Sequence, residues 1–127
     1  MAKENEKMKR ILLAISFCIL MSSTAYAQSP RVLWERVQVM EITHGTLTDN
    51  SQWTLLEAAP TAEKCIEAQR RVFEVRKNDY TALKDSLPQM QIWTTPYKSI
   101  TTQSGLEPAL ISNIFYCLPD TSDPRTH

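Results

Sequence analysis

The chain has 127 residues with 14 basic and 14 acidic side chains, so its formal net charge is zero. A single small domain of mixed charge has no excess of Lys and Arg with which to hold a phosphate backbone, which argues against nucleic acid as a partner. Its two glycines, Gly45 and Gly105, are too few for a glycine-rich phosphate-binding loop.

Residues 1–27 have the three parts of a cleavable secretory signal peptide. Four basic residues among the first ten precede an apolar run over residues 11–21, and the segment ends in an Ala-Tyr-Ala tripeptide. A basic start, an apolar middle and an Ala-x-Ala end are typical of a segment that signal peptidase removes. We therefore expect cleavage between Ala27 and Gln28 and export of the remaining chain to the periplasm or the extracellular space.

Two other interpretations of this segment fit less well. A permanent membrane anchor needs about 20 apolar residues to cross the hydrocarbon core, roughly twice the length of this run. Lipidation of Cys18 would require a small residue before it, whereas Phe17 precedes it. We expect no membrane span after cleavage. The remaining chain then carries a net charge of about −2, because four basic and two acidic residues leave with the signal peptide.

The cysteines predict one disulfide. Cys18 leaves with the signal peptide, so Cys65 and Cys117 remain, and in an oxidising compartment two such cysteines pair. The loop that they close runs over about 50 residues, for which the chain-entropy account gives on the order of 4 kcal/mol. Redox-active pairs usually have Cys-x-x-Cys spacing, which is absent here, so a structural disulfide is favoured.

The first elements after the signal peptide are expected to be two strands. Residues 32–42 are rich in β-branched and aromatic residues and alternate by two, with Leu33 and Val37 on one face and Arg36 on the other. Residues 52–58 form a similar short pattern. Turn-forming residues lie between the two, which predicts an antiparallel hairpin with a long, mobile connection.

From Thr61 the pattern changes to helical spacing. Thr61 is a suitable N-cap, and apolar residues from Ala62 to Phe73 recur on one side with charged residues opposite them. This amphipathic helix is expected to reach about Asn78 or to continue until Pro88 forbids it.

The rest of the chain contributes two short predicted strands, 90–94 and 113–118, separated by an irregular segment over 97–108. The order strand–strand–helix–strand–strand is typical of an α+β fold in which one helix packs across an antiparallel sheet. We expect a single small domain over 28–119, stapled by the disulfide and followed by a flexible polar tail, 120–127.

Candidate catalytic and metal-binding residues are few. His44 lies in a predicted turn and His127 ends the chain, so neither is the rigidly held histidine that nucleophilic catalysis needs. A zinc site needs three or four ligands at suitable spacing, and the sequence offers no convincing set. We therefore expect no metal and no cofactor. Glu35 and Glu41 are the carboxylates that a small carboxylate-based enzyme would use.

Two tryptophans in predicted strands differ in their surroundings. Trp53 shares a face with apolar Leu55, which favours packing in the core. Trp34 shares a face with Arg36 and Gln38, and an aromatic among polar residues on an outward strand face is a candidate binding anchor. The alternative is that a later loop or the tail covers it.

The end of the chain carries a recognisable pattern, YCLPDTSDPR over residues 116–125. Together with Trp34 and the upstream Cys65, it resembles a loose group of small exported bacterial proteins of unknown function with a YxCLPDTxDPR-like ending. The resemblance implies bacterial origin and export, and it implies no activity.

These observations favour a non-enzymatic binding or interaction domain of the cell envelope, with a protein of the envelope as its partner. The alternative is an inhibitor of a secreted hydrolase, in which the segment 97–108, with Tyr97, Lys98 and Ser99, would be an inserting loop. A small carboxylate-based enzyme is the least favoured of the three functions, since no recognisable catalytic constellation is present.

Overall fold

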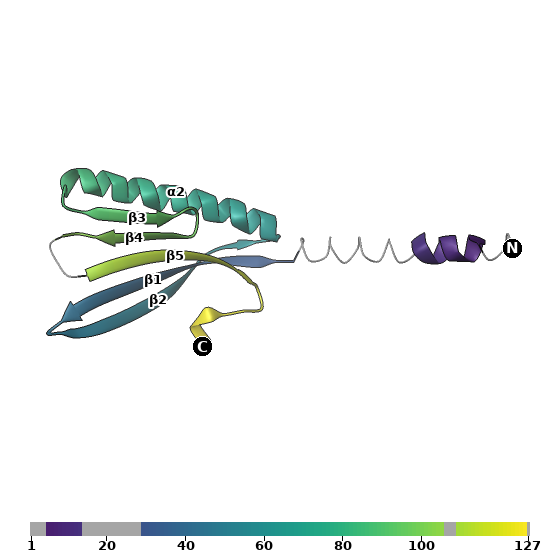
Figure 1. Ribbon diagram of the computed structural model, residues 1–127, viewed down its shortest axis with the longest axis horizontal. Coiled ribbons are helices and arrows are strands. Elements are labelled where there is room, and N and C mark those ends of the chain that lie inside the picture. Colours follow the sequence, from purple (N-terminus) through teal and green to yellow (C-terminus); the bar gives the residue numbers. More distant parts are fainter. Residues whose placement is uncertain (1–4, 14–28, 106–108, 127) are drawn as a thin grey trace.

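The computed structural model describes residues 5–13, 29–105 and 109–126 (Figure 1). Residues 5–13 are helical, and the expected cleavage site between Ala27 and Gln28 lies outside the described residues. Within the described ranges, no helix is long and apolar enough to cross a membrane.

The elements of the domain follow in the order β1 (Arg31–Thr43), β2 (Thr46–Ala59), α2 (Ala62–Ser86), β3 (Gln91–Thr95), β4 (Ser99–Gln103), β5 (Ala109–Pro119) and η1 (Pro124–Thr126), a short 3-10 helix. The five strands form one antiparallel sheet in the spatial order β2-β1-β5-β4-β3. Because β2 and β3 are the two edge strands, α2 connects opposite edges of the sheet and crosses one of its faces on the way (Figure 1).

The predicted α+β class is confirmed. The predicted order of elements along the chain is wrong in one place, because it lacks one strand. Residues Ser99–Gln103, expected to be irregular, form β4 between β3 and β5. Ile100 and Thr102 are buried from this strand. The strand carries a single aliphatic residue, so alternation of apolar and polar side chains is hidden, although threonine itself favours strands.

The connection between the first two strands is also shorter than expected. The strands run on to Thr43 and resume at Thr46, and the turn between them consists of His44 and Gly45, both with positive φ (51° and 78°). Two central residues with positive φ are the geometry of a type I′ turn, whose twist matches that of paired strands. The expectation of a long connection is therefore wrong.

Helix α2 follows the sequence pattern closely. The side chain of Thr61 accepts a hydrogen bond from the Lys64 backbone N–H at 3.1 Å, as expected for an N-cap. The helix ends at Ser86, before Pro88, which confirms the longer of the two expected ends.

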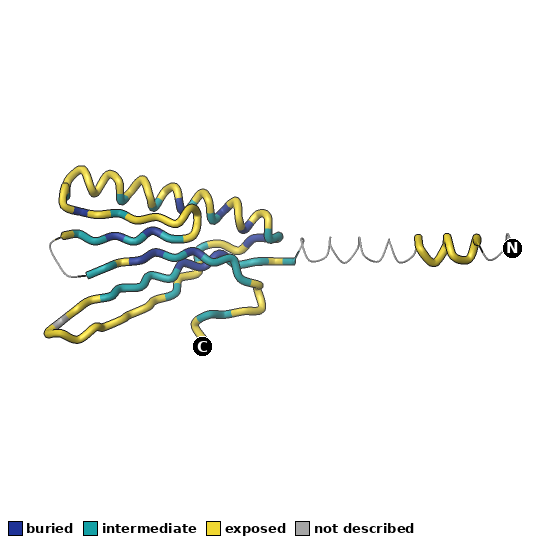
Figure 2. Tube along the Cα trace, viewed as in Figure 1, coloured by how far each residue is buried: buried dark blue, intermediate teal, exposed yellow. Residues whose placement is uncertain are grey.

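The core lies between α2 and the sheet. Its buried members include Leu33, Ile100 and Phe115 from the strands and Phe73 from the helix. Figure 2 shows that buried positions concentrate on the central strands and on one side of α2. The predicted disulfide joins Cys65 to Cys117, with a Cα–Cα distance of 6.0 Å, and fixes the first turn of α2 to β5.

Candidate functional site

The sheet has two faces with different surroundings, because successive side chains of a strand point to opposite sides. The helix-covered face carries Leu33, Glu35 and Phe115 and packs against α2. The opposite face, here called the open face, is formed by the other set of side chains from the five strands. Its members include Trp34, Arg36, Gln38, Met40, Ile42, Leu47, Asp49, Ser51, Trp53, Leu55, Trp93, Thr101, Leu110, Ser112, Ile114 and Tyr116.

A buried polar cluster lies on the helix-covered face. Arg76 of α2 donates from Nε and Nη2 to the two carboxylate oxygens of Glu35, each at 3.1 Å. Asn113 Nδ2 donates to Glu35 Oε2 at 3.1 Å, and Tyr80 Oη donates to Asn113 Oδ1 at 2.6 Å. These bonds satisfy a carboxylate that would otherwise be costly to bury.

The electrostatics of this cluster agree with a structural role. The hydrogen bond to Glu35 raises the pKa of Arg76, so the guanidinium stays charged. Burial, together with the nearby charge of Glu35, raises the pKa of the Tyr80 phenol, so its proton stays in the bond to Asn113. The cluster therefore holds α2 against β1 and β5, and its donors and acceptors are engaged with one another.

The two carboxylates that a small enzyme would use are not brought together. Glu35 is buried and bound to Arg76, whereas Glu41 is exposed six residues further along β1. Six residues of strand span about 20 Å, which exceeds the separation of the paired carboxylates in either class of glycosidase.

Neither the histidine that the structure describes nor its possible metal-ligating side chains form a catalytic or metal site. His44 is exposed in the turn between β1 and β2, and His127 lies outside the described residues. Across the ranges that the structure describes, no three His, Cys, Asp or Glu side chains are grouped so that they could hold a metal ion.

The open face has an aromatic end, formed by Trp34, Leu55, Tyr116 and Trp53. Trp34 lies opposite Leu55 on β2 and opposite Tyr116 on β5. The rings of Trp53 and Tyr116 have centroids 5.2 Å apart, and the guanidinium of Arg36 is 5.7 Å from the centroid of the Trp53 ring. Trp53 is only half-buried on this face, so it does not belong to the core that its sequence pattern predicts.

The structure decides between the two interpretations of Trp34. Its side chain is 3 % exposed, and the guanidinium of Arg125 lies 5.0 Å from its ring centroid. The C-terminal segment turns back toward this side of the sheet (Figure 1). Trp34 is thus covered by the tail in this structure and is not an exposed anchor.

The tail segment over residues 120–126, here called the C-terminal strap, has local structure of its own. The Asp123 carboxylate accepts hydrogen bonds from the Arg125 backbone N–H at 2.9 Å and from Arg125 Nη2 at 2.7 Å. The Thr126 backbone N–H donates to the Asp123 carbonyl at 3.2 Å. An Asp followed by Pro is a frequent start of a helical turn, and this is the sequence signal that could have indicated the strap.

The opposite end of the open face, here called the distal end, is apolar, and no element among the described residues covers it. Met40, Ile42, Leu47 and Leu110, with Gln103, line a shallow depression of about 230 Å³. Ile42 and Leu47 are 58 % and 65 % exposed. Sequence reasoning missed this end because Leu47 stands among turn-forming residues, and only the tight turn at Gly45 brings it opposite Ile42.

A polar band separates the two ends of the open face. Gln38 lies opposite Ser51 and Ser112, and the hydroxyls of Ser112 and Thr101 are 2.9 Å apart. Trp93 lies opposite Thr101 and is therefore on the same face, where it is 49 % exposed. The open face thus combines exposed apolar and aromatic side chains with hydrogen-bonding groups, among them the charged side chains of Arg36 and Asp49, which bond to Ser51 and Gln38.

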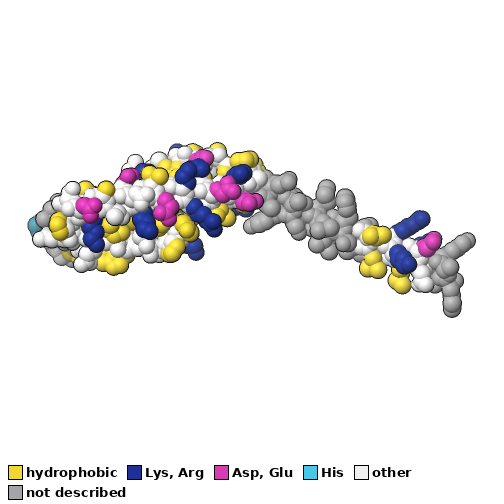
Figure 3. Space-filling model, turned by 90° about the horizontal axis from the view of Figure 1, so that it is seen from above, with side chains coloured by type: hydrophobic (Ala, Val, Ile, Leu, Met, Phe, Trp, Pro, Cys, Tyr) yellow, Lys and Arg dark blue, Asp and Glu magenta, His cyan; other side chains and the backbone are white. Residues whose placement is uncertain are grey.

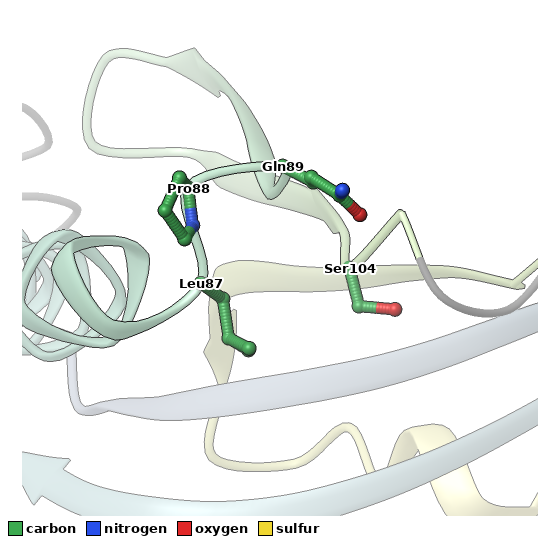
Figure 4. A pocket seen from close by; sticks show the side chains of 4 residues that line it. All are labelled: Leu87, Pro88, Gln89 and Ser104. Carbon is green, nitrogen blue, oxygen red and sulfur yellow. The ribbon is translucent and has the colours of Figure 1, made fainter.

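Two other regions of the molecule have fewer features of a functional site. A pocket of about 170 Å³ lies where the chain leaves α2 and is lined by Leu87, Pro88, Gln89 and Ser104 (Figure 4). None of these four side chains titrates near neutral pH, so the part of the pocket wall that the structure describes supplies no acid or base for chemistry.

The second region is the outer surface of α2, on the side of the helix that faces away from the sheet. Basic and acidic side chains are interspersed there rather than gathered by sign (Figure 3). Lys64 and Arg71 form exposed ion pairs with Glu67 and Glu57, with N–O distances of 3.3 and 2.7 Å. A surface of this kind is mutually neutralised and contributes little to recognition of a charged partner.

The segment expected to insert into a hydrolase is not an extended loop where the structure describes it. Residues 96–98 form a tight turn between β3 and β4, and Ser99 already belongs to β4. The Tyr97 ring packs edge-on against Phe73 at 5.5 Å and has the guanidinium of Arg70 5.2 Å from its centroid. Tyr97 is thus held against α2 rather than presented at the tip of a loop.

Comparisons with known proteins add no relative. No protein-family model, no curated protein and no solved structure matches this chain. The open face is therefore the candidate functional site on the strength of its own geometry.

Proposed function

We propose that this protein is a non-enzymatic binding domain of the cell envelope, and that it binds a protein partner on the open face of its sheet. The observation that supports this proposal most strongly is the exposure of Ile42, Leu47 and Trp93 on a single face, at 58 %, 65 % and 49 %. Apolar side chains gathered on an uncovered surface are characteristic of interaction sites.

The shape and composition of this face favour a protein over a small molecule. Small-molecule sites are usually enclosed cavities of about 300–1,000 Å³, whereas the distal depression is shallow and about 230 Å³. Protein interfaces combine aromatic and aliphatic contacts with neutral polar groups and are depleted of charge at their centre. The open face has this mixture of groups: the polar band of Gln38, Ser51, Thr101 and Ser112 lies between two apolar ends, and the charged side chains beside it, Arg36 and Asp49, are engaged in hydrogen bonds with Ser51 and Gln38.

The remaining features are consistent with a binding domain that is exported. The one buried carboxylate on the helix-covered face is held in an ion pair with Arg76, which suits stability better than proton transfer. The disulfide between Cys65 and Cys117 and the signal-peptide pattern of residues 1–27 both support a place in an oxidising compartment.

Site-specific photo-crosslinking in cells tests this proposal. A photoreactive amino acid placed at Leu47 or at Trp93 should give a discrete adduct with one envelope protein. Matched control positions are Ile66 and Val75 on α2, which are similarly exposed, at 48 % and 53 %, and should give no such adduct. Adducts from α2 but not from the open face would contradict the proposal.

The identity of the crosslinked partner also separates the proposal from its alternative. A partner that is a secreted hydrolase would be purified and assayed with and without this protein. Loss of its activity on addition of a stoichiometric amount would assign the protein as an inhibitor that acts through the open face. Unchanged activity would leave a binding role without inhibition.

A further inference from the structure

We propose that the C-terminal strap, residues 120–126, is a displaceable cover over Trp34, and that its opening extends the partner-binding open face to include this tryptophan. The inference rests on the proposed function for its biological meaning, since it describes how access to that same face is regulated. The opening of the strap itself can be measured without any partner.

The first observation is the burial of Trp34 on a face that is otherwise open. Its neighbour Leu55, directly opposite it on β2, is 50 % exposed, whereas Trp34 is 3 % exposed. Trp34 lies on the inner strand β1, between β2 and β5, and in addition the Arg125 guanidinium of the strap lies 5.0 Å from its ring centroid. The strap therefore contributes to the cover of Trp34 beyond what the neighbouring strands supply.

The second observation is the composition of the strap. Its residues, Asp-Thr-Ser-Asp-Pro-Arg-Thr, include no large apolar side chain that could anchor it in the core. The side chain of Arg125 remains 57 % exposed while it covers Trp34. Segments that bury little apolar surface of their own open locally at a small fraction of the free energy of global unfolding.

The third observation is that the strap keeps its shape through short-range bonds. Arg125 is clamped to Asp123, and the Ser122 backbone N–H donates to the Pro119 carbonyl at 3.0 Å. At its start, the Asp120 backbone N–H donates to the Pro30 carbonyl at 3.3 Å. Because the Asp120 bond continues the ladder between β1 and β5, the strap opens by a hinge after Asp120, which leaves that ladder in place.

Opening would create a larger aromatic surface. Trp34 would join Tyr116 and Trp53, which already contact each other at 5.2 Å between ring centroids. The Trp34 indole Nε1 is buried with no hydrogen-bond partner among the described residues, so a partner that replaces the strap could accept its hydrogen bond. Arg125 holds the place that a cationic or aromatic side chain of the partner would take.

Hydrogen exchange of the three tryptophan indole N–H groups, followed by NMR on the purified full chain, tests the proposal. Trp53→Phe and Trp93→Phe assign the Trp34 signal. If the strap opens to an extent of about 0.1–10 % of molecules, exchange at Trp34 is slowed only about 10- to 1,000-fold relative to free indole. That exchange should show little dependence on urea, because a local opening exposes little surface.

A pair of matched variants identifies the strap as the cause. Arg125→Ala removes the contact to Trp34 and should speed its indole exchange about three- to tenfold. Arg36→Ala removes the corresponding cation over Trp53 and should leave exchange at Trp34 unchanged. The proposal is overturned if the Trp34 indole exchanges only through global unfolding, with the same urea dependence as the Leu33 backbone N–H, or if Arg125→Ala has no effect on its rate.

The two proposals can fail separately. Fast, urea-independent exchange at Trp34 without any crosslink from Leu47 or Trp93 would support the strap and contradict the binding function. A crosslink from the open face together with exchange of Trp34 only on global unfolding would support binding and overturn the displaceable strap.

Discussion

The two faces of the sheet are built from the same five strands, yet they are completed in different ways. On the helix-covered face, Leu33 and Ile100 are fully buried, and the buried carboxylate of Glu35 is neutralised by Arg76. On the open face, Ile42 and Leu47 stay more than half exposed, and the only aromatic that is fully covered, Trp34, is covered by the C-terminal strap.

The difference follows from chain connectivity. Helix α2 joins the edge strands β2 and β3, so it can cross one face of the sheet and cannot reach the other. Apolar side chains on the crossed face gain burial, whereas those on the other face gain little from folding. These exposed apolar residues are the ones that the proposed binding function would use.

The largest expected effect on the helix-covered side comes from the disulfide. Replacing both cysteines, Cys65→Ala with Cys117→Ala, should lower the free energy of unfolding by about 4 kcal/mol, because the loop released in the unfolded state spans 52 residues. Urea denaturation of the variant, compared with the oxidised protein, measures this loss. A change below about 1 kcal/mol would show that the staple is not a main source of stability.

The next largest expected effect is the difference in stability loss between breaking a buried ion pair and breaking an exposed one. Arg76→Ala leaves the Glu35 carboxylate buried with a single donor and should cost about 2 kcal/mol. Arg71 is on the same helix as Arg76, and Arg71→Ala breaks its exposed ion pair with Glu57 of β2. This change should cost less than about 0.5 kcal/mol. Equal losses of the free energy of unfolding in the two variants, measured by urea denaturation, would contradict the distinction between the buried and the exposed ion pair.

A smaller effect appears at high pH. Burial raises the pKa of Tyr80 above its ordinary value of about 10, so its contribution to stability is complete below pH 10 and is lost as the pH rises through the raised value. Tyr80→Phe should cost about 1 kcal/mol at pH 7, because Asn113 Oδ1 loses its donor. As the pH rises above 10, the stability of the unaltered protein should fall more steeply than that of the variant, as thermal melts at stepped pH would show.

Local sequence patterns were sufficient for the features that depend on neighbours along the chain. The N-cap at Thr61 and the stop before Pro88 are properties of a few adjacent residues, and the structure has α2 between them. The disulfide could be predicted because only one pairing remains once Cys18 is assigned to the signal peptide.

Features that depend on distant partners could not be predicted in this way. Asp49 and Ser51 have turn-forming propensities, yet they lie in β2 because Gln38 and Arg36 of β1 bond to their side chains at 2.9 Å. The sequence of β4 has no apolar alternation. The segment nevertheless forms a strand, because β3 and β5 pair with it on either side. The covering of Trp34 by Arg125 joins residues from opposite ends of the domain, which no local pattern encodes.

The most direct test of the account is made on the double variant Ile42→Ser with Leu47→Ser, in which stability and binding are measured side by side. Both residues are on the open face and largely exposed, so we expect the free energy of unfolding to change by less than about 0.5 kcal/mol. Capture of the crosslinked envelope partner should fall at least about tenfold, as expected when two exposed apolar contacts of an interface are lost. Retained capture, or a loss of stability above about 2 kcal/mol as at a core position, would contradict the assignment of the open face to binding.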